Sequence, residues 1–123
     1  MTCIVGYRSH GTVVIGGDSA GIEGAYSLLR SDPKVFRNGD MIFGFTASFR
    51  MGQLLAHAFD IPKRHPETDI YHYMVTDFVD ALRQCLSAGG FAKREHEQEE
   101  GGRFLVGYAG RLFLIDADYQ IAE

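Results

Sequence analysis

The sequence predicts an α+β fold in which antiparallel β-sheets carry helices packed on one face. Short β-rich runs lie towards both ends of the chain, two segments of helical periodicity lie between them, and glycine-containing turns separate paired runs. Strands, then helices, then strands is not the alternation of a parallel βαβ protein. We expect one domain over residues 1–123, because a chain of 123 residues builds one core.

Two hairpins are predicted in the first half of the chain. The first pairs residues 2–8 with 11–17 across Ser9-His10, with Gly11 just behind. The second pairs 34–37 with 41–46, and its Asn38-Gly39 predicts a type I′ turn because these residues tolerate positive φ angles. The intervening stretch from Ser19 to Asp32 is interrupted by glycine and precedes Pro33, which predicts an irregular loop with some strand.

Two helices are predicted in the middle of the chain, packed on one face of the sheet. Ser48 is a candidate N-cap for the first, and the second begins near Asp69 and ends at Gly89-Gly90. The apolar stripes that predict them are Met51, Leu54, Leu55 and Ala58 in the first, and Met74, Phe78, Leu82, Cys85 and Leu86 in the second.

The last third is expected to hold a solvated connection and another hairpin. Residues 93–102 (KREHEQEEGG) are charged and have no apolar face, which is typical of a solvated segment. Residues 103–109 and 111–115, divided by Gly110, read as paired strands.

Composition excludes several classes of function. The net charge of −4 provides no basic field for nucleic acid, and no apolar run approaches the ~20 residues of a membrane helix. With no signal-peptide pattern, we expect a cytoplasmic protein. Cys3 and Cys85 lie in apolar segments and are expected to be buried thiols, with no metal and no cofactor. Four histidines are expected to be ordinary surface or satisfied residues: His57, His65, His72 and His96.

Thr2 is the residue that suggests chemistry. Removal of Met1 would make it the N-terminus, and a free α-amine, with a reference pKa of about 7.7 to 8.0, can accept the proton of the Thr2 hydroxyl. A nearby cation would favour the alkoxide, and a carboxylate would position that cation. Lys34 and Asp18 are the candidates for this cation and this carboxylate. Taken alone, Lys34 also fits a solvated surface lysine and Asp18 a turn residue.

Four segments together resemble the N-terminal half of proteasome β subunits and of their bacterial homologue HslV. The segments are Thr2-Cys3-Ile4-Val5, residues 11–19 (GTVVIGGDS), Lys34-Val35 and residues 44–48 (GFTAS). Asp18 follows Thr2 by 16 positions, and Lys34 follows Asp18 by the same interval. The resemblance implies an N-terminal nucleophile hydrolase with an αββα sandwich, a threonine-type peptidase in which Thr2 attacks an amide carbonyl and Lys34 and Asp18 tune the nucleophile.

The resemblance also implies further site residues. The backbone N–H of Ser48 would hold the oxyanion, although the family usually has glycine there and Ser48 fits equally well as an N-cap. Substrate contacts are implied for Ser19, Ala20 and Gly21 and, more weakly, for Phe49 and Met51. The spacing of Phe49 and Met51 also fits the core.

Family chains continue beyond the second hairpin with strands and helices that supply a Ser and an Asp, which this sequence does not include. A fragment, a partner-completed assembly and a degenerate protein all fit this difference. We expect a homo-oligomer acting on peptide or protein substrates, with a separate ATPase as a possible unfolding partner and an uncovered edge or face over residues 111–121. The alternative is a non-catalytic, proteasome-like scaffold or assembly subunit, which a retained Met1 would favour.

Overall fold

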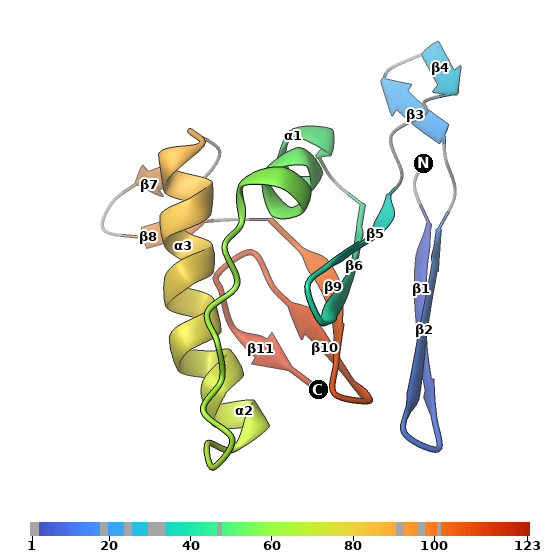
Figure 1. The fold of residues 1–123 in the computed structure, drawn as a ribbon. Helices are drawn as coiled ribbons and strands as arrows, with labels where there is room; N and C mark the ends of the chain where they lie inside the picture. Colours follow the sequence, from blue (N-terminus) through green and yellow to red (C-terminus); the bar gives the residue numbers. More distant parts are fainter. Residues whose placement is uncertain are drawn as a thin grey trace.

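The computed structural model describes residues 3–17, 20–23, 26–29, 34–46, 48–90, 93–95, 98–100 and 102–123, with the backbone alone in 20–23, 26–29, 93–95 and 98–100. Its elements are helices and antiparallel strands, which confirms the α+β class. Figure 1 shows three layers: helices on one side, a five-stranded sheet in the middle and a two-stranded ribbon on the other side.

The central sheet joins strands from both halves of the chain. Its order is β11-β10-β9-β6-β5, antiparallel throughout, with β9 paired to β6 across the intervening helices. The bounds are β5 Val35–Asn38, β6 Met41–Phe45, β9 Phe104–Tyr108, β10 Arg111–Ile115 and β11 Ile121–Ala122. Both predicted hairpins of this sheet are confirmed.

Three further hairpins stand outside the central sheet. They are β1 (Ile4–Ser9) with β2 (Thr12–Gly17), β3 (Ala20–Glu23) with β4 (Tyr26–Leu29), and β7 (Lys93–Glu95) with β8 (Gln98–Glu100). The first confirms the predicted opening hairpin. The third adds two short strands to the segment over 93–102, where the sequence predicted a solvated connection without strands, and its register sets Lys93 opposite Glu100.

Two helical segments form the outer layer, as the apolar stripes predicted. The first is α1 (Phe49–Gln53) running into the π-helical turn η1 (Leu54–Ala58), and the second is α2 (Ile70–Tyr73), η2 (Met74–Phe78) and α3 (Val79–Ala88). Ser48 caps the first, since its Oγ accepts from the Met51 N–H at 3.3 Å, and Asp69 caps the second through the His72 N–H at 3.0 Å. Both N-terminal signals in the sequence are therefore confirmed.

The core lies between the helices and one face of the central sheet. Alternate residues of β6 face it, so Met41, Phe43 and Phe45 are buried. The helices contribute Met51, Leu54, Leu55, Tyr73, Met74, Phe78, Leu82 and Leu86, and the other strands contribute Phe104, Val106, Phe113 and Ile115.

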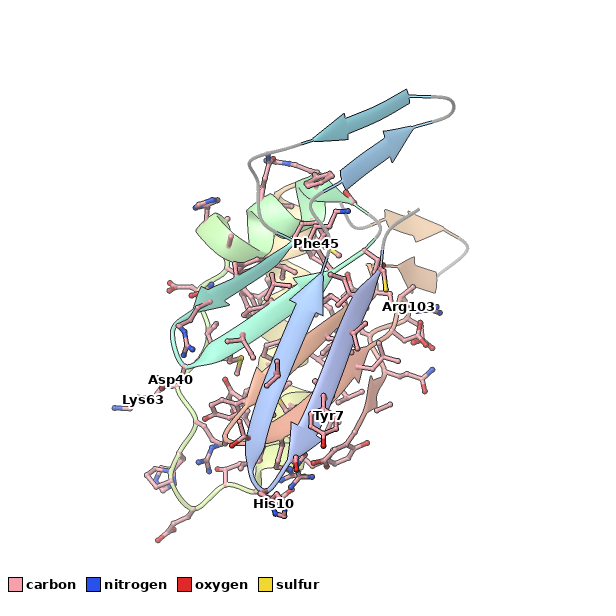
Figure 2. The ribbon with its side chains drawn as sticks, turned by 90° about the vertical axis from the view of Figure 1, so that its right-hand side faces the viewer. Tyr7, His10, Asp40, Phe45, Lys63 and Arg103 are labelled. Atoms are coloured by element: carbon pink, nitrogen blue, oxygen red, sulfur yellow. The ribbon has the colours of Figure 1, made fainter. Side chains whose placement is uncertain are left out.

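The ribbon packs on the opposite face of the sheet at sites where the sheet has no side chain. A Cβ atom at Gly44 would lie 2.6 Å from Ile15 Cγ2 and 2.9 Å from Ile4 Cγ2, and one at Gly107 would lie 2.9 Å from Val13 Cγ1. These glycines let the ribbon approach closely enough to bury Ile15. The outer ribbon face leaves Val5, Tyr7 and Val14 more than half exposed, and Figure 2 shows Tyr7 on this face.

The stretch over residues 111–121, where an uncovered edge or face was expected, has a covered face but reaches the edge of the central sheet at β11. Phe113, Ile115 and Ile121 are buried because β9 and β11 flank β10 while the helices cover its face. Within the described residues, the largest exposed apolar side chains lie instead on β1 and β2, with two more on the second helical segment. None of the described helices has an apolar stretch long enough to cross a bilayer.

Turn geometry follows the sequence at two hairpins and departs from it at a third. His10 and Gly11 have φ of 50° and 75°, and Ala109 and Gly110 have φ of 53° and 74°, the pattern of a type I′ turn. In the β5–β6 turn only Gly39 has positive φ, so the predicted type I′ turn is wrong and a type II′ turn with glycine first fits.

Gly110→Ala is expected to lower the free energy of unfolding by about 2–3 kcal/mol. The alanine would have to keep a φ of 74°, and its Cβ would lie 2.5 Å from the carbonyl oxygen of Gly11 in the neighbouring turn. Gly16→Ala is the matched control, because its Cβ would meet no atom within 4 Å. Urea unfolding of both variants checks this; equal stabilities would contradict the packing of the two turns.

Tyr73 makes the stability of the fold depend on pH in the alkaline range. Its hydroxyl donates to the Pro62 carbonyl, and desolvation by burial is the main cause that raises the pKa of Tyr73 to about 12. In the unfolded chain the Tyr73 phenol ionises near pH 10. The contribution of the neutral, buried phenol to stability is therefore full below pH 10 and is lost as pH rises towards 12.

Tyr73→Phe should therefore change the pH dependence of unfolding. The wild type is expected to lose about 1.4 kcal/mol more than the variant between pH 9 and pH 11, because only the wild type holds this neutral phenol in the fold. At pH 9 the variant should be less stable by about 1 kcal/mol through loss of the hydrogen bond to Pro62. Urea unfolding at the two pH values measures both; parallel pH profiles would refute the assignment.

Candidate active site

Lys34 is the only charged residue that is buried in the described part of the chain, with 2% of its surface exposed. It lies directly before β5, and its carbonyl accepts from the Phe45 N–H at 3.0 Å, which extends the β5–β6 pairing by one residue. Its Nζ lies 5.6 Å from the centre of the Phe49 ring. Burying an ammonium group costs free energy unless neighbouring groups stabilise its charge. The position of Lys34 therefore favours a catalytic role over that of a solvated surface lysine.

The chain neighbours of all three predicted catalytic residues meet at this end of the molecule. Gly17 pairs with Ile4 in the ribbon, and a Cβ atom on Gly17 would lie 3.5 Å from the Cys3 carbonyl oxygen and 3.4 Å from Val35 Cγ2. Cys3 follows Thr2, Gly17 precedes Asp18, and Val35 follows Lys34. The fold thus brings the three flanking segments to one place, although they come from distant parts of the sequence.

Several predicted site residues are outside the described residues or are described in part. Thr2, Asp18 and Ser19 lie outside them. Ala20 and Gly21 open β3, where they pair with Leu29 and Leu28 through the backbone. Lys34, Ser48 and Phe49 are described in full, so the structure places three of the eight predicted site residues with their side chains.

Ser48 joins β6 to the first helix. It has extended backbone (φ −141°, ψ 123°), and its carbonyl accepts from the Gly52 N–H at 3.1 Å while its Oγ caps Met51. Its own backbone N–H has no acceptor among the described residues. An N–H at the start of a helix carries partial positive charge, which is the requirement for stabilising an oxyanion.

An aromatic cavity of about 240 Å³ adjoins Lys34 through Phe49. Phe36 and Phe45 line it from the β5–β6 hairpin, and Phe49 with Gln53 and His57 line it from the first helical segment. Phe45 and Phe49 meet edge to face with ring centres 5.7 Å apart. Of these three phenylalanines only Phe49 was predicted as a site residue; the signal for Phe36 and Phe45 is their closeness in the sequence to Lys34 and Ser48.

The cysteines and histidines provide no metal centre among the described residues, where no group of three or more His, Cys, Asp or Glu side chains is placed to hold an ion. The expectation that Cys3 is buried was wrong, because Cys3 is exposed. It directly precedes β1, where alternate residues point away from the central sheet, and Cys3 falls on that outward side. Cys85 is half-buried, and burial raises the pKa of its thiol. His96 lies outside the described residues.

Comparison of the chain with protein-family models, with curated proteins and with solved structures gave no match in any of the three.

Proposed function

We propose that this protein is an N-terminal nucleophile amide or peptide hydrolase in which Thr2, exposed by removal of Met1, attacks the substrate carbonyl. One observation carries this proposal: the segments that flank Thr2, Asp18 and Lys34 converge, with Gly17 packed against Cys3 and Val35. The burial of the Lys34 ammonium at the same end of the sheet supports it.

In this proposal Thr2 supplies both nucleophile and base. Its α-amine takes the hydroxyl proton as Oγ bonds to the carbonyl carbon, and the resulting oxyanion accepts from the Ser48 N–H. The C–N bond then breaks, the amine returns its proton to the leaving nitrogen, and an ester to Thr2 remains. Water, deprotonated by the same amine, hydrolyses the ester.

Lys34 and Asp18 act on the nucleophile in this scheme. A neighbouring ammonium disfavours protonation of the Thr2 α-amine and stabilises negative charge on Oγ, while the Asp18 carboxylate orients that ammonium. Lys34 is buried, and a buried site of low dielectric screens charge weakly. Such electrostatic effects are therefore large at this position.

The substrate is proposed to be a peptide with an apolar side chain next to the bond that is cut. The cavity beside Lys34 is lined by Phe36, Phe45 and Phe49 and is large enough for a Leu or Phe side chain. Ser19, Ala20 and Gly21 are proposed to contact the peptide as well.

The helix, sheet and ribbon layers support the first three layers of an αββα sandwich, with the fourth proposed to cover the outer ribbon face. Exposure of Val5, Tyr7 and Val14 there also favours the second candidate, an assembly subunit that uses the same face without catalysis. Homo-oligomerisation is compatible with both candidates.

Two measurements on the wild-type protein test the proposal. Intact mass should show loss of Met1, and fluorogenic peptides with Leu or Phe before the cleaved bond should be hydrolysed faster than those with Asp there. Retained Met1 together with no hydrolysis would favour the assembly subunit.

A further inference from the structure

A second cavity, of about 400 Å³, lies at the end of the β5–β6 hairpin away from Lys34. Met41 lines it at the start of β6, whereas Phe45 at the other end of β6 borders the aromatic cavity. Four residue steps of about 3.3 Å separate the two ends of this strand by roughly 13 Å. Figure 2 shows Asp40 and Lys63 near this end and Phe45 near the other. The volume of this second cavity is within the range of roughly 300–1,000 Å³ typical of small-molecule sites.

Arg64 is held in place on the wall of this cavity. Its Nε donates to Tyr108 Oη at 3.2 Å, its Nη1 donates to the Thr68 carbonyl at 2.8 Å, and its guanidinium carbon lies 5.9 Å from the centre of the Tyr108 ring. Within the described residues, Nη2 makes no such contact. A guanidinium fixed on two sides with one edge unused is preorganised for an acidic ligand group.

Two further donors line the same cavity. Lys63 is exposed, and the described contacts include no ion pair to its ammonium. The Tyr108 hydroxyl accepts from Arg64, and no described acceptor takes the proton that it can donate. A guanidinium, an ammonium and a phenol hydroxyl thus line the same cavity as hydrogen-bond donors.

The charge and the apolar walls of the cavity define the ligand. Among the described residues that line it, Asp40 is the only acidic one, against the two cations of Lys63 and Arg64, so one positive charge remains. This balance suits a singly charged carboxylate better than a phosphate dianion. Ile61 and Pro62 provide an apolar surface beside these charges.

We propose that this cavity binds a small monocarboxylate with an apolar body, its carboxylate held between Arg64 Nη2 and the Lys63 ammonium. The carboxylate could belong to a free organic acid or to the C-terminus of a peptide. The proposal is independent of the hydrolase proposal, because its residues lie at the other end of the hairpin.

Three probes with similar apolar bodies test the ligand class by NMR titration of the ¹⁵N-labelled protein: 4-methylpentanoate, N-acetyl-leucine and the neutral N-acetyl-leucinamide. Saturable shifts at Met41, Lys63 and Tyr108 are expected with the acids, with at least about tenfold weaker binding of the amide. Saturation by both acids indicates free acids as ligands, and saturation by N-acetyl-leucine alone indicates peptide C-termini. Binding of the amide as tight as that of the acids, or no saturation by either acid, overturns the proposal.

Two variants test the assigned residues. Arg64→Met is expected to weaken binding of the tighter acid at least about tenfold, and Lys63→Ala about three- to tenfold. Arg83→Met, which removes an exposed cation on α3, is the control and should leave the affinity unchanged. Since Arg64 also anchors Tyr108 and Thr68, Arg64→Met could unfold the protein; Lys63 is exposed, so Lys63→Ala then decides. Wild-type affinity in Lys63→Ala overturns the proposal, as does an equal loss in Arg83→Met.

Discussion

Replacing Thr2 with alanine is expected to lower kcat/KM for peptide hydrolysis at least about a thousandfold. The variant keeps the α-amine but loses the oxygen that forms the bond to the substrate carbonyl, so no ester intermediate can form. The assay compares variant and wild type on the best wild-type peptide, with circular dichroism and urea unfolding to verify an intact fold. Unchanged turnover in a folded Thr2→Ala protein would remove the mechanism.

Two neighbouring substitutions serve as controls for this variant. Thr2→Ser retains a hydroxyl and an α-amine on one residue, so measurable hydrolysis should persist. Cys3→Ser removes the exposed thiol beside Thr2 and should leave hydrolysis unchanged. Loss of activity in Cys3→Ser, with activity in Thr2→Ala, would instead assign the nucleophile to Cys3.

Lys34→Met is expected to lower kcat at least about a hundredfold while leaving a folded protein. Methionine has a similar length and is apolar like the adjacent Phe49 ring, but it removes the buried ammonium that lies over that ring. Without that cation the pKa of the Thr2 α-amine should rise, so more of the base is protonated at pH 7. The acidic limb of the pH–rate profile should therefore move to higher pH, which a merely structural effect would not produce.

Arg83→Met is the control for the lysine variant, since it removes an exposed cation on α3 that pairs with Asp80 at 3.7 Å. Its rate and pH profile should match those of the wild type. An unshifted acidic limb in Lys34→Met would show that Lys34 does not act on the base.

Local signals in the sequence were sufficient for most secondary structure. Ser48 and Asp69 predicted helix starts because their side chains cap backbone N–H groups. Ser9-His10, with Gly11 just behind, predicted a tight hairpin, and in the structure His10 and Gly11 take positive φ. The apolar stripes predicted which helix faces are buried, with Leu82 and Leu86 fully inside.

Long-range contacts decided what the sequence could not predict. Asn38 was expected to support its own turn, but its Nδ2 donates to the carbonyls of Leu55 and Phe59 at 2.9 and 3.0 Å and fixes the hairpin against the helix end. The pairing of β9 with β6 also depends on the whole chain, and it determines which face of the sheet is left for the ribbon. Exposure of Cys3 follows from that arrangement, because its outward side has no layer over it among the described residues.

The candidate site was predictable in its parts and not in its assembly. Thr2, Asp18 and Lys34 were suggested by residue type and by the family resemblance, whereas the approach of Gly17 to Cys3 and Val35 is a property of how ribbon and sheet stack. The aromatic cavity likewise needs β6 and the first helix to meet, which joins Phe45 to Phe49.

Covalent labelling with a peptide epoxyketone, followed by mass mapping, tests the N-terminal nucleophile most directly, since this reagent joins to the hydroxyl and the α-amine of one N-terminal residue. One adduct per chain on Thr2 is predicted, retained in Cys3→Ser, lost in Thr2→Ala and strongly slowed in Lys34→Met. A protein that still begins with Met1 and stays unlabelled, or an adduct mapped to Cys3, would contradict the account.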